Sequence, residues 1–242
     1  MKTQIEQLQE IIDGSDSIVF FGGAGVSTES GIPDFRSVDG LYNQKYDYPP
    51  ETIISHSFYM RNKKEFYRFY KDRMLFPDAK PNAAHLKLAE LERAGKLKAV
   101  VTQNIDGLHQ MAGSKEVLEL HGSVHRNICL RCGKVYDLKY VMDDPDPVPH
   151  CECGGELKPD VVLYEESLDS NVISKTLHYI GTCDTLIIGG TSLVVYPAAG
   201  FIRSFRGRHL VLINKSATMA DDEAELVINK PIGEVFSQIV VR

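Results

Sequence analysis

The chain has 242 residues, of which 43% are hydrophobic and 25% are charged, and its formal net charge is −6. Its length suits one large α/β domain with a small insert, and its composition is that of an ordinary globular protein. The acidic balance argues against a protein that wraps nucleic acid, so we expect no sequence-specific nucleic-acid partner.

No segment of the sequence has the pattern of an export signal or a membrane span. Glu6, Glu10 and Asp13 interrupt the apolar residues of the N-terminus, which a secretory signal would not allow. Glycines and Pro197 interrupt the uncharged stretch 185–202, which favours a strand, a loop and a helix start. We therefore expect a cytoplasmic protein with no membrane partner.

Hydrophobic periodicity and turn residues predict the elements of the first half of the chain. They are a helix over 5–12 that Gly14 ends, a strand over 17–21, an aromatic amphipathic segment over 61–74, a helix over 81–94, and strands over 97–102 and 117–120. Residues 126–158 hold four cysteines and three prolines, and we interpret them as a separate small module.

After this module, strands and helices alternate again. The expected elements are a strand over 161–164, a helix over 170–180, a strand over 185–189, a helix from Pro197 to Gly207, strands over 209–213 and 226–228, and a terminal helix over 232–240. Such alternation predicts an α/β fold in which helices cover both faces of a parallel sheet.

A glycine-rich segment, 22–36, follows the first predicted strand and reads GGAGVSTESGIPDFR. Backbone without Cβ atoms can come close to a phosphate. Gly23 and Gly25 match the first two glycines of a dinucleotide fingerprint, whereas Thr28 stands where the third would pack helix on strand. The polar and aromatic residues 32–36 do not suit a plain crossover helix. We therefore predict a dinucleotide that is held in an unusual way.

Polar clusters follow four of the predicted strands: the glycine segment, 103–106, 190–192 and Asn214-Lys215. Ligands of open parallel sheets bind outside the carboxyl ends of the strands, so these clusters predict one composite site. Loops are polar in any case, and Asn214-Lys215 alone would be ordinary. The segment 103–106 is less easily explained, because three polar side chains without glycine make a poor generic turn.

His121 is the strongest catalytic candidate, because it ends a predicted strand at this edge of the sheet. An imidazole titrates near working pH and suits a general base, although a histidine in the core or at a cap is the plain alternative. Asp34, Arg36 and Asp106 are charged residues of the same site. Arg36 could bind a pyrophosphate through two hydrogen bonds, and Asp106 could hold a ribose or polarise a leaving group.

Cys129, Cys132, Cys151 and Cys153 predict a structural metal site. The spacing is that of a four-cysteine zinc pattern, except that the second pair is separated by one residue. Clustered cysteines in a chain without a secretion signal favour metal over disulfides. Four sulfurs close the coordination sphere, so we expect one structural zinc ion. Cys183, which stands alone, is interpreted as a small buried hydrophobic residue.

The sequence resembles the sirtuins, NAD-dependent protein lysine deacylases, from about residue 17 to 232. The resemblance rests on an ordered set of segments: 23–36, 102–106, 121–123, the cysteine module, 190–193 and Asn214. It implies a larger Rossmann-like domain and a smaller inserted zinc-binding and helical domain. The implied ranges are 1–34, 76–125 and 158–242 for the Rossmann-like domain, 35–75 for a cofactor-binding loop and helical module, and 126–157 for the zinc module.

The resemblance also implies the roles of individual residues in binding NAD and acyl-lysine. The NAD contacts would be Ala24, Thr28, Phe35, Arg36, Gln103, Ile105, Asp106, His121, Thr191, Ser192, Asn214, Lys215 and Ile232. The catalytic residues would be His121, Asn104 and Asp106. The acyl oxygen of the substrate lysine would attack the ribose as nicotinamide leaves, with His121 as general base, giving free lysine and an O-acyl-ADP-ribose.

Acetylated protein or peptide substrates are the implied partners. Val162, Tyr164 and Val194 would contact them, since an extended peptide can add a strand to an exposed edge. Two departures from the family are Glu165, where glycine is common, and the shortened second cysteine pair. Sirtuins that prefer acidic acyl groups have a Tyr-x-x-Arg pair, but here Tyr67 is followed by Tyr70. We therefore expect removal of acetyl or another uncharged acyl group.

Three alternatives remain open from the sequence. A conventional NAD-linked oxidoreductase would need an acidic ribose-binding residue about 20 positions after the glycine turn, and 42–45 offers no clear strand for it. A protein ADP-ribosyltransferase would release nicotinamide through the same positively charged ribose. A non-enzymatic NAD or zinc-binding module would release no nicotinamide.

Overall fold

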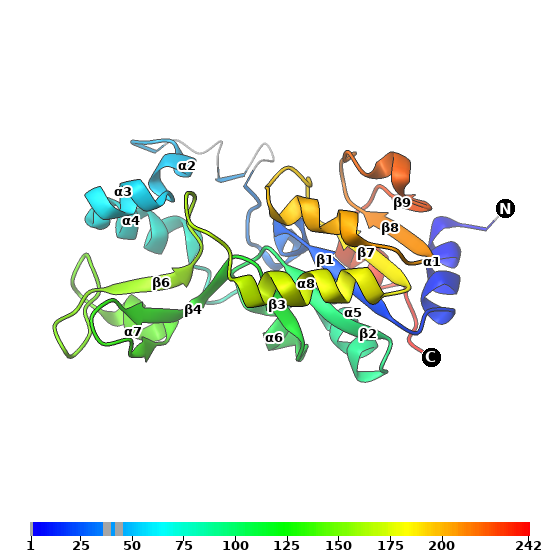
Figure 1. Ribbon diagram of the computed structural model, residues 1–242, viewed down its shortest axis with the longest axis horizontal. Coiled ribbons are helices and arrows are strands. Elements are labelled where there is room, and N and C mark those ends of the chain that lie inside the picture. Colours follow the sequence, from blue (N-terminus) through cyan, green and yellow to red (C-terminus); the bar gives the residue numbers. More distant parts are fainter. Residues whose placement is uncertain (1, 36–39, 42–45) are drawn as a thin grey trace.

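The computed structural model describes residues 2–35, 40–41 and 46–242. Its larger part is a six-stranded parallel sheet in the order β3-β2-β1-β7-β8-β9 (Figure 1). The strands are β1 (Ile18–Gly22), β2 (Leu97–Thr102), β3 (Val117–Glu119), β7 (Thr185–Gly189), β8 (His209–Ile213) and β9 (Leu226–Ile228). Every residue of β1 and β7 is buried, which explains why these central strands are nearly continuous apolar runs.

Helices cover both faces of this sheet, as the sequence predicts. One apolar core joins the strands to α1 (Gln4–Asp13), α5 (Ala83–Arg93) and α9 (Ile232–Phe236). A second core, on the opposite face, joins them to α8 (Ser170–Thr182) and the 3₁₀ helix η5 (Ala198–Ser204). The short α6 (Leu108–Ala112) packs beside α5, and η6 (Asp221–Glu223) precedes β9.

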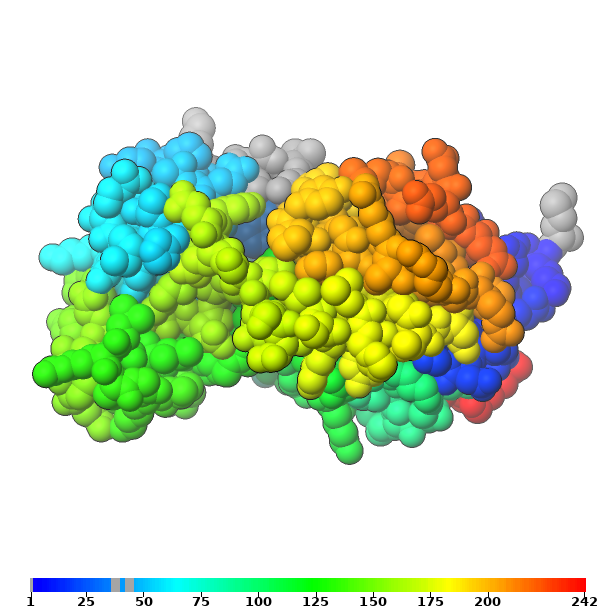
Figure 2. Space-filling view, in the orientation of Figure 1, coloured from blue at the N-terminus to red at the C-terminus, as the bar shows by residue number. Residues whose placement is uncertain are grey.

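The smaller part of the molecule combines two separate segments of the chain. Its antiparallel sheet has the order β5-β4-β6, from β4 (Gly122–Cys129), β5 (Val135–Tyr136) and β6 (Leu157–Val161), with α7 (Leu138–Asp143) beside it. The other segment supplies α2 (Pro50–Ile53), α3 (His56–Arg61), α4 (Lys63–Phe69) and the π-helical turn η4 (Tyr70–Met74). Both segments share one core, rich in aromatic rings. Figure 2 shows this part, in cyan and green, at one end of the molecule.

Four expected elements differ from the structure. The strand expected over 161–164 ends at Val161, and the residues beyond it form a turn. The segment 61–74 divides at Asn62, whose side chain caps α4 by accepting a hydrogen bond from the backbone of Glu65. The segment after Pro197 is 3₁₀ rather than α-helical, and the terminal helix ends at Phe236.

No helix in the described part of the chain has both the length and the apolar character that a membrane crossing requires.

Candidate active site

A cavity of about 530 Å³ lies where the carboxyl ends of the large sheet face the smaller part of the molecule. Most of the predicted site residues line it: Ala24, Thr28, Asp34, Phe35, Gln103, Asn104, Ile105, Asp106, His121, Val162, Tyr164, Thr191, Ser192, Asn214, Lys215 and Ile232. Arg36 lies outside the described residues. Val194 is 46% exposed and stands outside the lining, whereas its neighbour Val195 belongs to it.

The glycine turn after β1 packs directly against the loop after β7. The backbone N–H of Gly25 donates to the Gly190 carbonyl at 2.8 Å. A Cβ on Gly25 would lie 2.8 Å from the Gly190 Cα, and a Cβ on Gly190 would lie 2.4 Å from the backbone nitrogen of Val26. These glycines are therefore needed for the contact between two loops, in addition to any close approach of a phosphate. The contact places η1 (Ala24–Val26) on the cavity wall.

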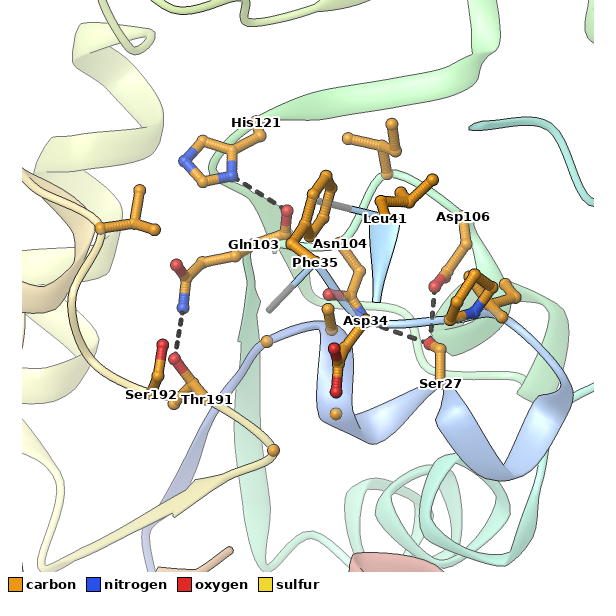
Figure 3. Close-up of a pocket in the computed structure, with 18 of the residues that line it drawn as sticks. Ser27, Asp34, Phe35, Leu41, Gln103, Asn104, Asp106, His121, Thr191 and Ser192 are labelled. Atoms are coloured by element: carbon orange, nitrogen blue, oxygen red, sulfur yellow. Dashed lines mark hydrogen bonds between the residues drawn. The ribbon is translucent and has the colours of Figure 1, made fainter. Parts of the chain in front are cut away.

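A chain of hydrogen bonds links three polar side chains at the base of the cavity (Figure 3). Asn104 Nδ2 donates to Ser27 Oγ at 3.0 Å, and Ser27 Oγ donates to the Asp106 carboxylate at 2.6 Å. The second oxygen of that carboxylate accepts from the backbone of Leu108 at 2.9 Å, at the start of α6. Ser27 is fully buried, so its hydroxyl fixes both side chains.

Sequence reasoning missed Ser27. Ser27 lies inside the glycine segment, where small polar residues are common, so the sequence did not indicate that its hydroxyl holds two site residues.

The orientation of His121 is set by a neighbouring backbone carbonyl. Its Nδ1 lies 3.0 Å from the carbonyl oxygen of Gln103, which can only accept a hydrogen bond, so Nδ1 bears the proton in the neutral ring (Figure 3). Nε2 is then the basic nitrogen. Burial lowers the pKa of His121, although the Gln103 carbonyl partly opposes this by favouring the protonated ring. Burial therefore favours the neutral imidazole, which is the form that a general base needs.

Gln103 itself is held in two places. Its side-chain amide donates to Thr191 Oγ1 at 3.2 Å, and its backbone N–H donates to the Gly22 carbonyl at 3.0 Å. The last residue of β1 and the residues after β2 and β7 are thus joined into one wall of the cavity, as the polar clusters after the strands predict.

His125 is a second histidine at this site, and sequence reasoning did not single it out. Its Nε2 lies 2.9 Å from the Asp106 carbonyl oxygen, and its ring lies over Gly107, where a Cβ would come within 2.6 Å. Gly107 also has a φ of 72°, which favours glycine. His125 therefore supports the loop that presents Asp106.

The four cysteines meet in the smaller part of the molecule, where Cys129 ends β4. Their sulfurs lie within 4.8 Å of one another, with Cys129 and Cys153 at 3.5 Å and Cys132 and Cys151 at 3.6 Å. A tetrahedral zinc ion with Zn–S bonds of about 2.3 Å would separate its sulfurs by about 3.8 Å. Backbone N–H groups of Arg131 and Cys132 point at the Cys129 sulfur, at 3.4 Å each. The four thiolates fit one structural zinc ion.

Comparison with known proteins gives the family. The sequence model of the Sir2 family matches residues 23–197. An "NAD-dependent protein deacetylase" of Clostridium acetobutylicum is 59% identical over 240 residues, which cover 98% of each chain. One with the same description from Clostridium perfringens is 60% identical, over 99% of this chain and all of its own. The chain belongs to the Sir2 family.

Solved Sir2 structures have the same fold as this Sir2 protein. One, from work on the mechanism and regulation of Sir2 enzymes, is 42% identical with a TM-score of 0.88 and covers 99% of this chain and 97% of its own. Another, described as Sir2 with a p53 peptide and NAD+, is 38% identical with a TM-score of 0.84 over 98% and 97% of the two chains. The expected α/β fold, with a Rossmann-like sheet and a smaller zinc-binding domain, is confirmed.

In this Sir2 protein, the tyrosine pair of the aromatic segment is enclosed in the core of the smaller domain. Tyr67 and Tyr70 are buried, and the Tyr67 hydroxyl donates to the Leu157 carbonyl at 2.6 Å. Burial raises the pKa of both tyrosine hydroxyls far above the ordinary value for tyrosine. Both rings pack in the same aromatic cluster, 6.1 Å apart between centroids. Neither belongs to the lining of the cavity.

Proposed function

We propose that this Sir2 protein is an NAD-dependent protein lysine deacetylase, which converts acetyl-lysine and NAD to lysine, nicotinamide and O-acetyl-ADP-ribose. One observation supports this proposal above all: the His121 imidazole lines the cavity with its proton held on Nδ1 and its basic Nε2 available. Bound NAD would supply the ribose carbon that the acyl oxygen attacks and the nicotinamide that leaves.

The residues of the chain would act on this reaction through proton transfer, electrostatics and exclusion of water. His121 Nε2 would accept a proton from a ribose hydroxyl. The Asp106 carboxylate and the Asn104 amide would stabilise positive charge as it develops on the ribose. Phe35, on the cavity wall, would keep water from the reacting carbon, so that the substrate reacts first.

The remaining contacts are proposals of the same kind. Ala24, Thr28, Phe35, Arg36, Gln103, Ile105, Thr191, Ser192, Asn214, Lys215 and Ile232 would bind NAD, and Val162, Tyr164 and Val194 would bind the substrate. Cys129, Cys132, Cys151 and Cys153 would hold zinc. We also propose three domains: 1–34 with 76–125 and 158–242 as the Rossmann-like domain, 35–75 as the cofactor-binding loop and helical module, and 126–157 as the zinc module. Strand β6 crosses the boundary between residues 157 and 158, because Leu157–Val161 pairs with β4 as one unit.

Peptides or proteins acetylated on lysine are the proposed partners, in the cytoplasm. A solved Sir2 structure, 37% identical to this chain, is described as bound to an acetylated peptide. Another of the same identity is described as Sir2Tm with a propionylated peptide, which agrees with a site for uncharged acyl groups.

The test is nicotinamide release from NAD with acetylated, succinylated and unmodified copies of one peptide. We expect release with the acetylated copy only, together with loss of the acetyl mass from the peptide. Addition of ADP-ribose to the peptide would indicate an ADP-ribosyltransferase, and absorbance of reduced nicotinamide would indicate an oxidoreductase. Faster removal of succinyl than of acetyl would contradict the proposed acyl preference.

A further inference from the structure

Glu165 occupies a backbone conformation that side chains rarely adopt. The backbone N–H of Glu166 donates to the Leu163 carbonyl at 3.0 Å, which closes a turn whose third residue is Glu165. The φ of Glu165 is 75°, in the left-handed region. Turns with a positive φ at this position usually have glycine there, because a Cβ is crowded by the backbone. Something must therefore compensate the unfavourable conformation of Glu165.

The side chain of Glu165 provides that compensation by bonding to α3. One carboxylate oxygen accepts from the backbone N–H of Ser57 at 2.8 Å, and the other accepts from Ser57 Oγ at 3.0 Å. Ser57 stands in the first turn of α3, where backbone N–H groups have no partner within the helix. Hydrogen bonds to an ionised carboxylate are stronger than neutral ones.

The residue before Glu165 is attached to the same part of the chain. The backbone N–H of Tyr164 donates to the Ile54 carbonyl at 3.0 Å, and the backbone N–H of His56 donates to the Tyr164 carbonyl at 2.9 Å. Four hydrogen bonds thus tie residues 164–165 to residues 54–57. Residues 162–166 also line the large cavity, so these hydrogen bonds fix the position of this part of the cavity wall.

We propose that Glu165 is a positioning residue, whose carboxylate holds loop 162–166 against α3 and so pre-forms the wall that binds the acylated peptide. The inference rests on the proposed function, in which this loop contacts the substrate. Glu166 supports the turn independently, because its carboxylate accepts from the Leu163 backbone at 2.9 Å and from Lys158 Nζ at 3.1 Å. Loss of the Glu165 carboxylate should therefore loosen the loop without unfolding it when residue 165 keeps a Cβ at this positive φ. Glycine adopts this φ without strain and should need no such attachment.

Three variants of the full-length protein test this role in deacetylation assays with one acetylated peptide. Glu165→Ala keeps a Cβ at the positive φ but removes both hydrogen bonds to Ser57. We expect its KM for the peptide to rise roughly five- to tenfold, while kcat and the KM for NAD stay within about twofold. Glu165→Gly removes the carboxylate and the unfavourable conformation together, so its peptide KM should stay within about twofold of wild type.

The matched control is Glu51→Ala. Glu51 is an exposed acid that lines the same shallow surface hollow as Glu165 and Ser57, so it reports on the local charge alone. An unchanged peptide KM in this variant supports the positioning role. Equal effects of Glu51→Ala and Glu165→Ala would overturn it in favour of a general charge effect. Equal effects of Glu165→Gly and Glu165→Ala would overturn it in favour of direct contact between the carboxylate and the peptide.

Thermal unfolding separates this inference from the proposed function. We expect a lower midpoint for Glu165→Ala than for wild type and Glu165→Gly, whether or not the wild type deacetylates peptides. A wild type without deacetylase activity would end the proposed function. Equal midpoints for Glu165→Ala and Glu165→Gly would end the proposal that the attachment to α3 compensates the positive φ of Glu165.

Discussion

His121 Nδ1 lies 3.0 Å from the carbonyl oxygen of Gln103. Gln103 follows β2 and His121 follows β3, so both residues lie at the same edge of the sheet. This single contact determines which ring nitrogen bears the proton, and it turns the other nitrogen into the base.

Activity should therefore depend on pH through His121. Burial lowers the pKa of this imidazole, so the acid limb of kcat/KM should have its midpoint below the ordinary value of about 6.5. The neutral ring is the active form because it acts as the base, so activity falls as pH falls through the lowered pKa.

His121→Ala should reduce turnover by roughly 10²–10⁴-fold with the fold intact. Unchanged turnover would contradict the assignment.

Ser27→Ala should impair catalysis although the side chain bears no charge. The change removes the donor to Asp106 and the acceptor of Asn104 inside a buried network, at a cost of about 1–3 kcal/mol. We expect kcat/KM to fall roughly tenfold to a hundredfold. Ser174→Ala, at an exposed position on α8, is the control and should behave as wild type. Equal kinetics for the two variants would show that Ser27 does not position the catalytic side chains.

Removal of zinc should destabilise the smaller domain. Cys129→Ser removes one of four sulfurs that lie within 4.8 Å, and part of the free energy of folding of a small metal domain comes from the metal. We expect bound zinc to fall from one ion per chain, measured by atomic absorption, together with a lower thermal midpoint. Cys183→Ser is the control, because Cys183 is buried beside Ile180 and far from the cluster in sequence. Full zinc content in Cys129→Ser would refute the site.

Two buried histidines should make the protein sensitive to acid. His85 and His109 are buried with ring centroids 4.7 Å apart. Burial lowers the pKa of His85 to about 4, against the opposing charge of Asp106, and burial also lowers the pKa of His109. The unfolded chain protonates both rings near pH 6.5 and the folded chain does not, so stability is lost as pH falls from about 6.5 to 4.

Each such ring contributes at most about 1.4 kcal/mol to the loss of stability per pH unit, and about half of that at pH 6.5, where the ring is half protonated in the unfolded chain. Urea unfolding between pH 7 and 5.5 measures this slope, in a range above the titration of ordinary carboxyl groups. His109→Leu should reduce the slope, because one of the two titrating rings is gone. The same slope in His109→Leu and wild type would show that His109 does not contribute to the acid sensitivity.

The sequence by itself determined the elements whose signals lie within a few neighbouring residues. The apolar runs of β1, β2 and β7 are evident because strands buried on both faces need no polar alternation. The spacing of the cysteines indicated a closed metal site, and the polar residues after the strands indicated which end of the sheet holds the ligand.

The tertiary structure alone decided contacts between residues far apart in the chain. Ser27 meets Asp106 across 79 positions, and Glu165 meets Ser57 across 108. It also ended the small sheet at Val161, where the chain turns toward α3 and Tyr164 forms an isolated parallel bridge with Ser55. Periodicity and turn preferences act between near neighbours, whereas a hydrogen bond between distant side chains depends on how whole elements are placed. That placement is the sum of many packing contacts, which no local pattern records.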